Sequence, residues 1–343
     1  MTGTAWWERH QVPLYLASIA LGAVVGLLVP GIAGRAEAVI MPVLALLLYV
    51  TFLAVPIGRI GRALTDRRFL LTVLAVNFIA VPLVALALAA FLAGRPALLL
   101  GVLVVLLAPC IDYVIVFTDL AGGSADRLVA CTPVLMLVQL LAVPLLLALA
   151  VGPDVLGRLD LGPFVAAFVF LIALPLAAAW ATQAAHARGV RAATVLGEGG
   201  AAAMVPLLMV TLAVVVASQL RRLLDQPATV LLAVPVFVLF AVVMVAVGAV
   251  AGRVARLDVP GRRAVVFTGV TRNSLVVLPV TLALPGDLAV VPGVVVTQTL
   301  VELIVMVLLV RLVPRLIAER PGGSVRRDGV HGGSRAAPPT RRS

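Results

Sequence analysis

Long apolar stretches alternate with short polar segments along most of this chain. Ten of the stretches approach the roughly 20 residues that an α-helix needs to cross a bilayer. They cover residues 12–29, 38–56, 69–92, 98–118, 128–150, 162–184, 200–219, 227–250, 264–284 and 288–310. The pattern predicts an all-α polytopic membrane protein with ten transmembrane helices.

The composition agrees with this class. The chain is 63% hydrophobic and 12% charged, whereas soluble domains are roughly 45–50% apolar and 25% charged. We therefore expect an integral membrane protein. Its two cysteines, Cys110 and Cys131, both fall in apolar stretches, which argues against a disulfide framework.

Two of the apolar stretches are interrupted by polar residues near their middle. The fourth contains Ala108-Pro109-Cys110-Ile111-Asp112-Tyr113, and the ninth contains Thr271-Arg272-Asn273-Ser274. Ionisable groups in hydrocarbon cost about 3 kcal/mol or more each, so they persist mainly where they pair, face a cavity or serve a function. Interrupted helices in corresponding halves of a membrane protein are typical of a transporter's binding site.

The ten stretches divide into two halves, residues 12–150 and 162–312. Each half holds five predicted spans, and an odd number means that the second half is inserted upside down relative to the first, the inverted-repeat plan of many secondary transporters. Broken helices 4 and 9 are then expected to cross near the midplane. Crossing would bring together five candidate substrate-binding residues: Cys110, Asp112, Arg272, Asn273 and Ser274. In the alternative interpretation, Asp112 and Arg272 are a buried pair that only fixes the packing.

The net charge of +11 is explained by membrane topology, not by nucleic-acid binding, because the arginines cluster in alternate loops. With a cytoplasmic amino terminus, twenty arginines lie inside and five lie in the outside loops. The positive-inside rule then predicts that both termini, residues 1–11 and a disordered tail at 316–343, are cytoplasmic. The absence of lysine points to a GC-rich bacterial genome, and hence to the plasma (inner) membrane.

Several motifs resemble the superfamily that joins arsenite-efflux permeases of the Acr3 type with bile acid:sodium symporters. Leu107-Ala108-Pro109-Cys110 is similar to the fourth-helix motif of the permeases, whose cysteine is held to be essential. The other similar segments are Asn77-Phe78 with Pro82, Val205-Pro206-Leu207-Leu208 with Gln219, and Arg272-Asn273-Ser274-Leu275. The resemblance implies a panel of helices 1, 2, 6 and 7 and a core of helices 3–5 and 8–10.

The chain also departs from both branches of that superfamily. Two positions at which the symporters hold sodium are here Thr268 and Arg272, and a guanidinium would repel a cation. Leu275 stands where the permeases carry a glutamate. We expect Asp112 to take over proton coupling, with its pKa lowered whenever Arg272 is near.

Cys110 has a specific role in the arsenite interpretation. Trivalent arsenic is thiophilic, so one thiolate could coordinate it reversibly, as a thiolate coordinates a soft metal ion. Several thiols would hold the metalloid too tightly for release. Alternatively, Cys110 is a small buried apolar residue, as free cysteine often is. Cys131 lacks the Ala-Pro-Cys context, and we interpret it as a residue that only fills space in the apolar interior.

Arg272 carries the competing interpretation, in which it binds the carboxylate, sulfonate or oxyanion of an organic substrate. Asp112 argues against this, because it would cancel the charge. Asn77, Thr268 and Glu302 are candidate coupling or path residues in either case.

The sequence therefore predicts a secondary transporter that exports arsenite or a related metalloid or oxyanion. We expect an antiporter whose coupling ion is the proton in preference to sodium. The alternative is a sodium-coupled organic-anion symporter. We expect no enzyme activity and no cofactor, because the three histidines lie outside the spans and no nucleotide-binding or hydrolase motif is present.

Overall fold

The computed structural model describes residues 10–29, 31–54, 65–92, 94–111, 113–151, 169–225, 227–282, 284 and 288–318. Within these ranges the protein is nearly all helical and contains no β-strand. The predicted cytoplasmic residues 1–9, the tail from 319 onward and Asp112 lie outside them.

The helices follow the apolar stretches of the sequence. Bilayer-spanning segments are helical because a helix satisfies its own backbone hydrogen bonds. In chain order the elements are α2 (Gln11–Leu28), α3 (Ile32–Ala54), α5 (Arg67–Ala75), the π-helix η2 (Val76–Ala80), α6 (Val81–Ala89), η3 (Ala90–Leu92), α7 (Pro96–Leu106), α8 (Tyr113–Leu120), α9 (Ala125–Val151), the π-helix η4 (Val169–Ala173), α12 (Leu174–Ala187), α13 (Arg191–Asp225), α14 (Pro227–Val254), α15 (Val259–Val270), α16 (Ser274–Leu282) and α17 (Val291–Leu316).

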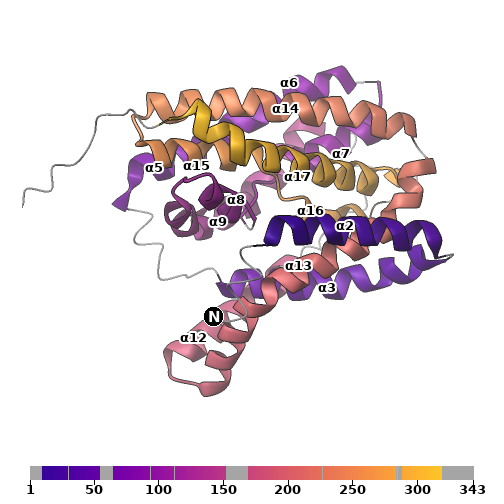
Figure 1. The fold of residues 1–343 in the computed structure, drawn as a ribbon, viewed down its shortest axis with the longest axis horizontal. Helices are drawn as coiled ribbons and strands as arrows, with labels where there is room; N and C mark the ends of the chain where they lie inside the picture. Colours follow the sequence, from indigo (N-terminus) through magenta and orange to yellow (C-terminus); the bar gives the residue numbers. More distant parts are fainter. Residues whose placement is uncertain are drawn as a thin grey trace, which may run out of the picture.

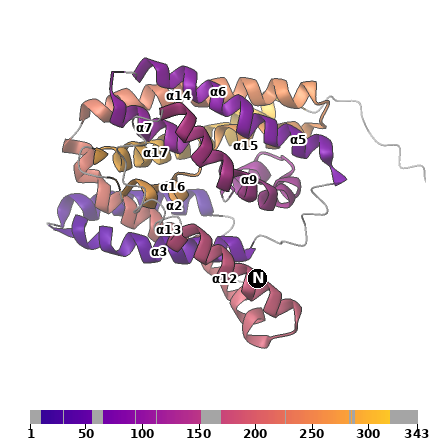
Figure 2. The same ribbon diagram turned by 180° about the vertical axis from the view of Figure 1, so that it is seen from behind.

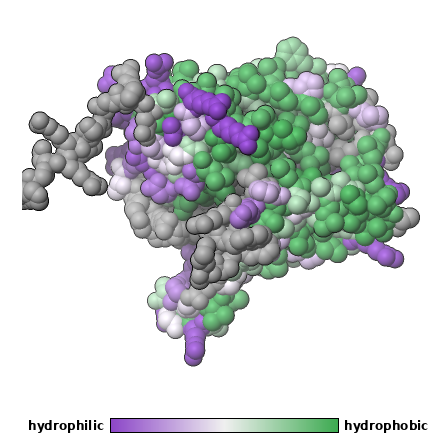
Figure 3. Space-filling model, viewed as in Figure 1, coloured by the Kyte–Doolittle hydropathy of each residue, from purple (hydrophilic) through white to green (hydrophobic). Residues whose placement is uncertain are grey.

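Six of the described helices or continuous helical segments are long and apolar enough to cross a membrane. Two shorter apolar helices, Pro13–Leu28 and Pro96–Leu106, accompany them. Hydrophobic residues cover a broad band of the surface, whereas hydrophilic residues gather mainly towards one end (Figure 3). These features support a multi-pass membrane protein. The ten-helix inverted repeat and the cytoplasmic position of the termini stay predictions.

The helices pack in two groups (Figure 1). One group consists of α2, α3, α12 and α13. The second contains α5 to α7, α14, α15 and α17, and α9 lies on its outer face when the molecule is seen from behind (Figure 2). The two groups are joined by contacts of α13 with α14 and α17, and by α16, which contacts both α3 and α17.

Within the first group, α2 lies directly on the backbone of α13. A Cβ atom added at Gly22 would lie 2.3 Å from the carbonyl oxygen of Ala213, and one added at Gly26 would lie 2.9 Å from that of Ala217. Small residues four apart allow this close approach, which is a common way for membrane helices to associate.

Charged residues tie together the helix ends at one end of the second group. The Arg127 guanidinium binds Asp258 at 2.7 Å and lies 3.6 Å from Asp66, so the starts of α9, α15 and α5 meet there. Arg263 donates hydrogen bonds to the carbonyl oxygens of Ala121 at 3.2 Å and of Ile317 at 3.0 Å, which adds the ends of α8 and α17. Arginine suits helix ends, where carbonyl oxygens lack intrahelical partners.

Candidate functional site

The two polar breaks predicted from the sequence lie side by side in the structure. The first break separates α7 from α8, and the second, at residues 271–273, separates α15 from α16. An antiparallel bridge joins Pro109 to Arg272. The N–H of Asn273 donates to the carbonyl oxygen of Ala108 at 2.8 Å, and the N–H of Cys110 donates to that of Thr271 at 3.3 Å.

This bridge explains how an interrupted helix is tolerated inside an apolar protein. Pro109 has no N–H to donate and its ring disturbs the preceding helical turn, so nearby backbone groups lose their intrahelical partners. Non-helical backbone at membrane depth requires partners within the protein or a water-filled cavity. Here each break supplies the hydrogen-bonding partners of the other.

The bridge brings four of the five predicted substrate-binding residues together. Cys110, Arg272, Asn273 and Ser274 are all at most 1% exposed. The fifth, Asp112, lies outside the described residues. The crossing of two interrupted segments is therefore a feature of the structure, and the substrate role of its residues stays a prediction.

Arg272 is fully buried, and its side chain runs back towards the end of α15. Its guanidinium donates to the carbonyl oxygens of Thr268 at 2.6 Å, Gly269 at 3.0 Å and Leu106 at 3.3 Å. It also donates to the Asn77 Oδ1 atom at 2.9 Å and lies 5.8 Å from the centre of the Phe240 ring. Buried charges require such partners, because removal from water is otherwise very costly.

Asn77 connects Arg272 to Thr268. Its Nδ2 atom donates to the Thr268 Oγ1 atom at 3.1 Å and to the carbonyl oxygen of Val73 at 3.0 Å. Asn77 lies on the π-helix η2, and such π-helical turns often mark functional sites. The three residues thus form one buried polar cluster.

Glu302 of α17 lies against the other side of the bridge. Its Oε2 atom accepts a hydrogen bond from the backbone N–H of Arg272 at 2.8 Å and another from the side-chain amide of Gln298. The Gln298 Oε1 atom is buried and has no hydrogen-bond partner among the described residues. A narrow cavity borders this pair and is lined by Leu106, Phe237, Phe240, Ala241, Val270, Gln298 and Glu302.

Asn273 and Ser274 begin the second half of the broken segment. The Asn273 Oδ1 atom accepts from the N–H of Val276 at 3.2 Å, which caps the start of α16. The Ser274 hydroxyl accepts a hydrogen bond from Thr299 at 2.8 Å. The buried Asn273 Nδ2 atom has no hydrogen-bond partner in the described part of the chain, so it remains available to a ligand.

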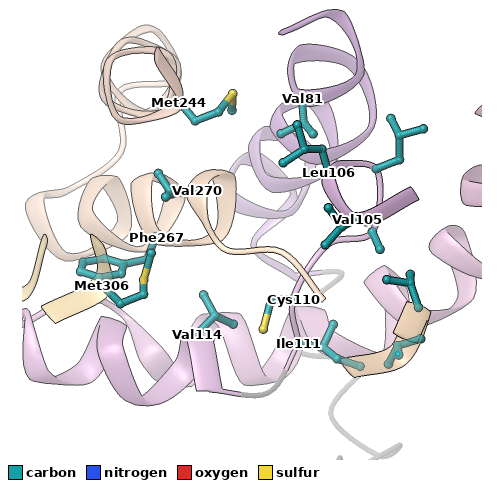
Figure 4. Packing of buried hydrophobic residues seen from close by; sticks show 14 of the residues in the cluster. Val81, Val105, Leu106, Cys110, Ile111, Val114, Met244, Phe267, Val270 and Met306 are labelled. Atoms are coloured by element: carbon teal, nitrogen blue, oxygen red, sulfur yellow. The ribbon is translucent and has the colours of Figure 1, made fainter. Parts of the chain in front are cut away.

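Cys110 sits in a more apolar setting than its neighbours across the bridge. It lies in the extended segment near Ile111 and Val114, and Phe267, Val270 and Met306 line the same region (Figure 4). Neither Cys110 nor Cys131 forms a disulfide bond. No group of three histidine, cysteine, aspartate or glutamate residues converges within the described ranges.

Sequence reasoning missed two contributors to the site, the Phe240 ring and the carbonyl oxygen of Leu106. Neither carries a local signal, because any residue type offers a carbonyl and a phenylalanine in an apolar helix is ordinary. Gln298, four residues before Glu302 on one helix face, is a signal that does show in the sequence.

Comparison with known proteins supports the superfamily that the motifs resemble. No curated protein matches the chain significantly. Residues 41–188, which include the break at Cys110, match the model of the Sodium Bile acid symporter family. That family suggests a membrane transporter, with a small-molecule substrate and a coupling ion, and not an enzyme.

Proposed function

We propose that this protein is a secondary active transporter that exports arsenite or a related metalloid or small oxyanion by proton exchange. Its proposed fold is the ten-helix inverted repeat, with both termini on the cytoplasmic side. The single observation that supports the proposal best is the hydrogen-bonded crossing of two interrupted helical segments, with the Cys110 thiol at that crossing.

The crossing provides the chemical groups that a small polar substrate needs at membrane depth. In transporters of this plan, half-helix ends near the midplane replace the water of a small solute. The Asn273 amide supplies a donor that the described residues do not use. A single thiol at the same place favours a soft metalloid, because one thiolate contact is strong enough to select it and weak enough to release it.

Glu302 is the proposed proton carrier among the described residues. Its carboxylate accepts a hydrogen bond from the Arg272 backbone, and protonation would convert one carboxyl oxygen from an acceptor into a donor. That change alters the contact between α17 and the bridge. Asp112 remains the second proposed carboxylate, as the sequence predicts.

A sodium-coupled organic-anion symporter is the second candidate function, and the family match favours it. Arg272 was expected to hold the substrate anion in this case. Its guanidinium donates instead to four oxygen atoms of the protein, so Asn273 and Ser274 are the better candidates for that contact.

The proposal is tested by arsenite accumulation in an efflux-deficient bacterium that expresses the full chain. Cys110→Ser should raise accumulation to the level of the empty vector. Cys131→Ser is the matched control, because it removes the other cysteine, which is equally buried and likewise forms no disulfide, and it should leave efflux unchanged. Equal accumulation with wild type and empty vector, at matched membrane abundance, would refute arsenite export, and organic-anion uptake with and without sodium would then be measured.

A further inference from the structure

The guanidinium of Arg272 fills a position lined by oxygen atoms from three different elements. Thr268 and Gly269 of α15 and Leu106 of α7 contribute carbonyl oxygens at 2.6, 3.0 and 3.3 Å. Asn77 of η2 contributes a side-chain oxygen at 2.9 Å. All four are neutral oxygens, and the side chain that they surround has no exposed surface.

Two helix ends make this position electrostatically negative. Leu106 is the last residue of α7, and Thr268 and Gly269 lie in the last turn of α15, which ends at Val270. The carbonyl groups of a last helical turn lack intrahelical partners and carry the negative end of the helix dipole. Two such ends that converge in a dry interior repel each other unless a positive charge lies between them.

The same oxygen atoms are of the type that binds metal cations. Alkali ions in proteins are held by rings of backbone carbonyl oxygens, and hard cations in general prefer carbonyl and amide oxygen ligands. The Phe240 ring, 5.8 Å from the guanidinium carbon, adds an aromatic face that also favours a cation. The position is therefore built for a positive charge, and in this chain the charge is covalently attached.

We propose that the Arg272 guanidinium is a tethered cation, which occupies an oxygen-lined position that would otherwise take a monovalent metal ion. Arginine stays protonated at any physiological pH, so the position is always filled and works without a dissociable ion. The expectation that transport does not depend on sodium at this position rests on the proposed function. The expectation about ion binding at this position does not rest on it.

The inference predicts that removal of the side chain creates an ion requirement. In Arg272→Ala the four oxygens would remain around a space that sodium or potassium can enter. An ion at ten times its Kd shifts the folding equilibrium about elevenfold towards the folded state. The variant should therefore be less stable than wild type in choline chloride and should regain stability, saturably, in sodium or potassium chloride.

The experiment is thermal unfolding of the purified full chain in detergent, in sodium, potassium and choline chloride at equal ionic strength. The Tm of wild type should not differ between the three salts, and neither should the Tm of Arg272→Lys, because both proteins keep a tethered positive charge. Arg272→Ala and Arg272→Gln should show a Tm that rises with one metal ion and not with choline. The added change Asn77→Ala should weaken that response, because it removes one of the four oxygens.

Arg221→Ala is the matched control. Arg221 also binds carbonyl oxygens at a helix end, those of Gly26 and Leu27 at 3.1 Å each, but Arg221 itself is an exposed residue, so water can replace it. Its loss should lower Tm without ion specificity. No ion-specific response in either Arg272→Ala or Arg272→Gln, or an equal response in wild type, would overturn the inference. The unfolding measurement needs no substrate, so it tests the inference even if the proposed function is wrong.

Discussion

The two chain breaks that cross in this protein differ in chemistry. The break between α7 and α8 carries Pro109 and Cys110 and lies among apolar side chains. The break between α15 and α16 carries Arg272, Asn273 and Ser274, and the side chain of each of these makes a hydrogen bond. The comparison indicates that the second break fixes the geometry of the crossing, and under the proposed function the first would supply the thiol that selects the substrate. Substitutions on the polar side should then affect stability most.

The largest loss of stability is expected for Glu302→Ala. The change leaves the backbone N–H of Arg272 and the amide of Gln298 without their acceptor, and two such buried losses together cost about 3 kcal/mol. Thermal unfolding in detergent measures this. Glu302→Gln keeps one acceptor oxygen and should lose less, so equal stability of the two variants would contradict the role given to the carboxylate.

A smaller loss is expected for Asn77→Ala. Asn77 accepts a hydrogen bond from the Arg272 guanidinium and donates one to Thr268, and a buried hydrogen bond to a charged group is worth about 2 kcal/mol. The control is Gln139→Ala on α9, because the Gln139 Oε1 atom has no hydrogen-bond partner among the described residues. If both variants unfold at the same temperature, Asn77 does not stabilise the cluster.

Asn273→Ala should cost about 1 kcal/mol, the usual value of a helix N-cap, because the Asn273 side chain accepts from the N–H of Val276. The same unfolding experiment measures it. Asn273→Ser keeps a neutral capping oxygen and should recover most of the loss. A full loss in both variants would show that the Nδ2 group, not the cap, is what the fold needs.

The smallest effect on stability, under about 1 kcal/mol, is expected for Cys110→Ala, because the thiol behaves as a small apolar group in its setting. Arsenite efflux should nevertheless be lost in this variant. Stability is read from unfolding and efflux from accumulation in cells. A variant that is as unstable as Asn77→Ala, or that still exports arsenite, would remove the distinction between the two breaks.

The sequence was sufficient to predict both breaks, because a proline followed three residues later by a carboxylate and an arginine next to an asparagine are conspicuous in apolar stretches. The division of the spans into two halves predicted that the breaks lie together. The sequence also indicated Asn77, Thr268 and Glu302 as candidate coupling or path residues, and the structure places all three in hydrogen-bonded contact with each other or with Arg272. It could not predict the Arg272 partners Leu106 and Phe240, since these depend on how α7 and α14 pack. The expected pairing of Arg272 with Asp112 stays a prediction, as Asp112 lies outside the described residues.

The backbone contact between α2 and α13 limits how the molecule can change shape. A Cβ atom added at Gly22 would lie 2.3 Å from the carbonyl oxygen of Ala213. The two backbones are therefore in direct contact at that point, with no layer of long side chains between them. A sliding motion there would require atoms to overlap, so we expect α2 and α13 to move together as one rigid unit. We therefore expect an opening of the crossing to be taken up at other contacts, those of α13 with α14 and α17 and of α16 with α3.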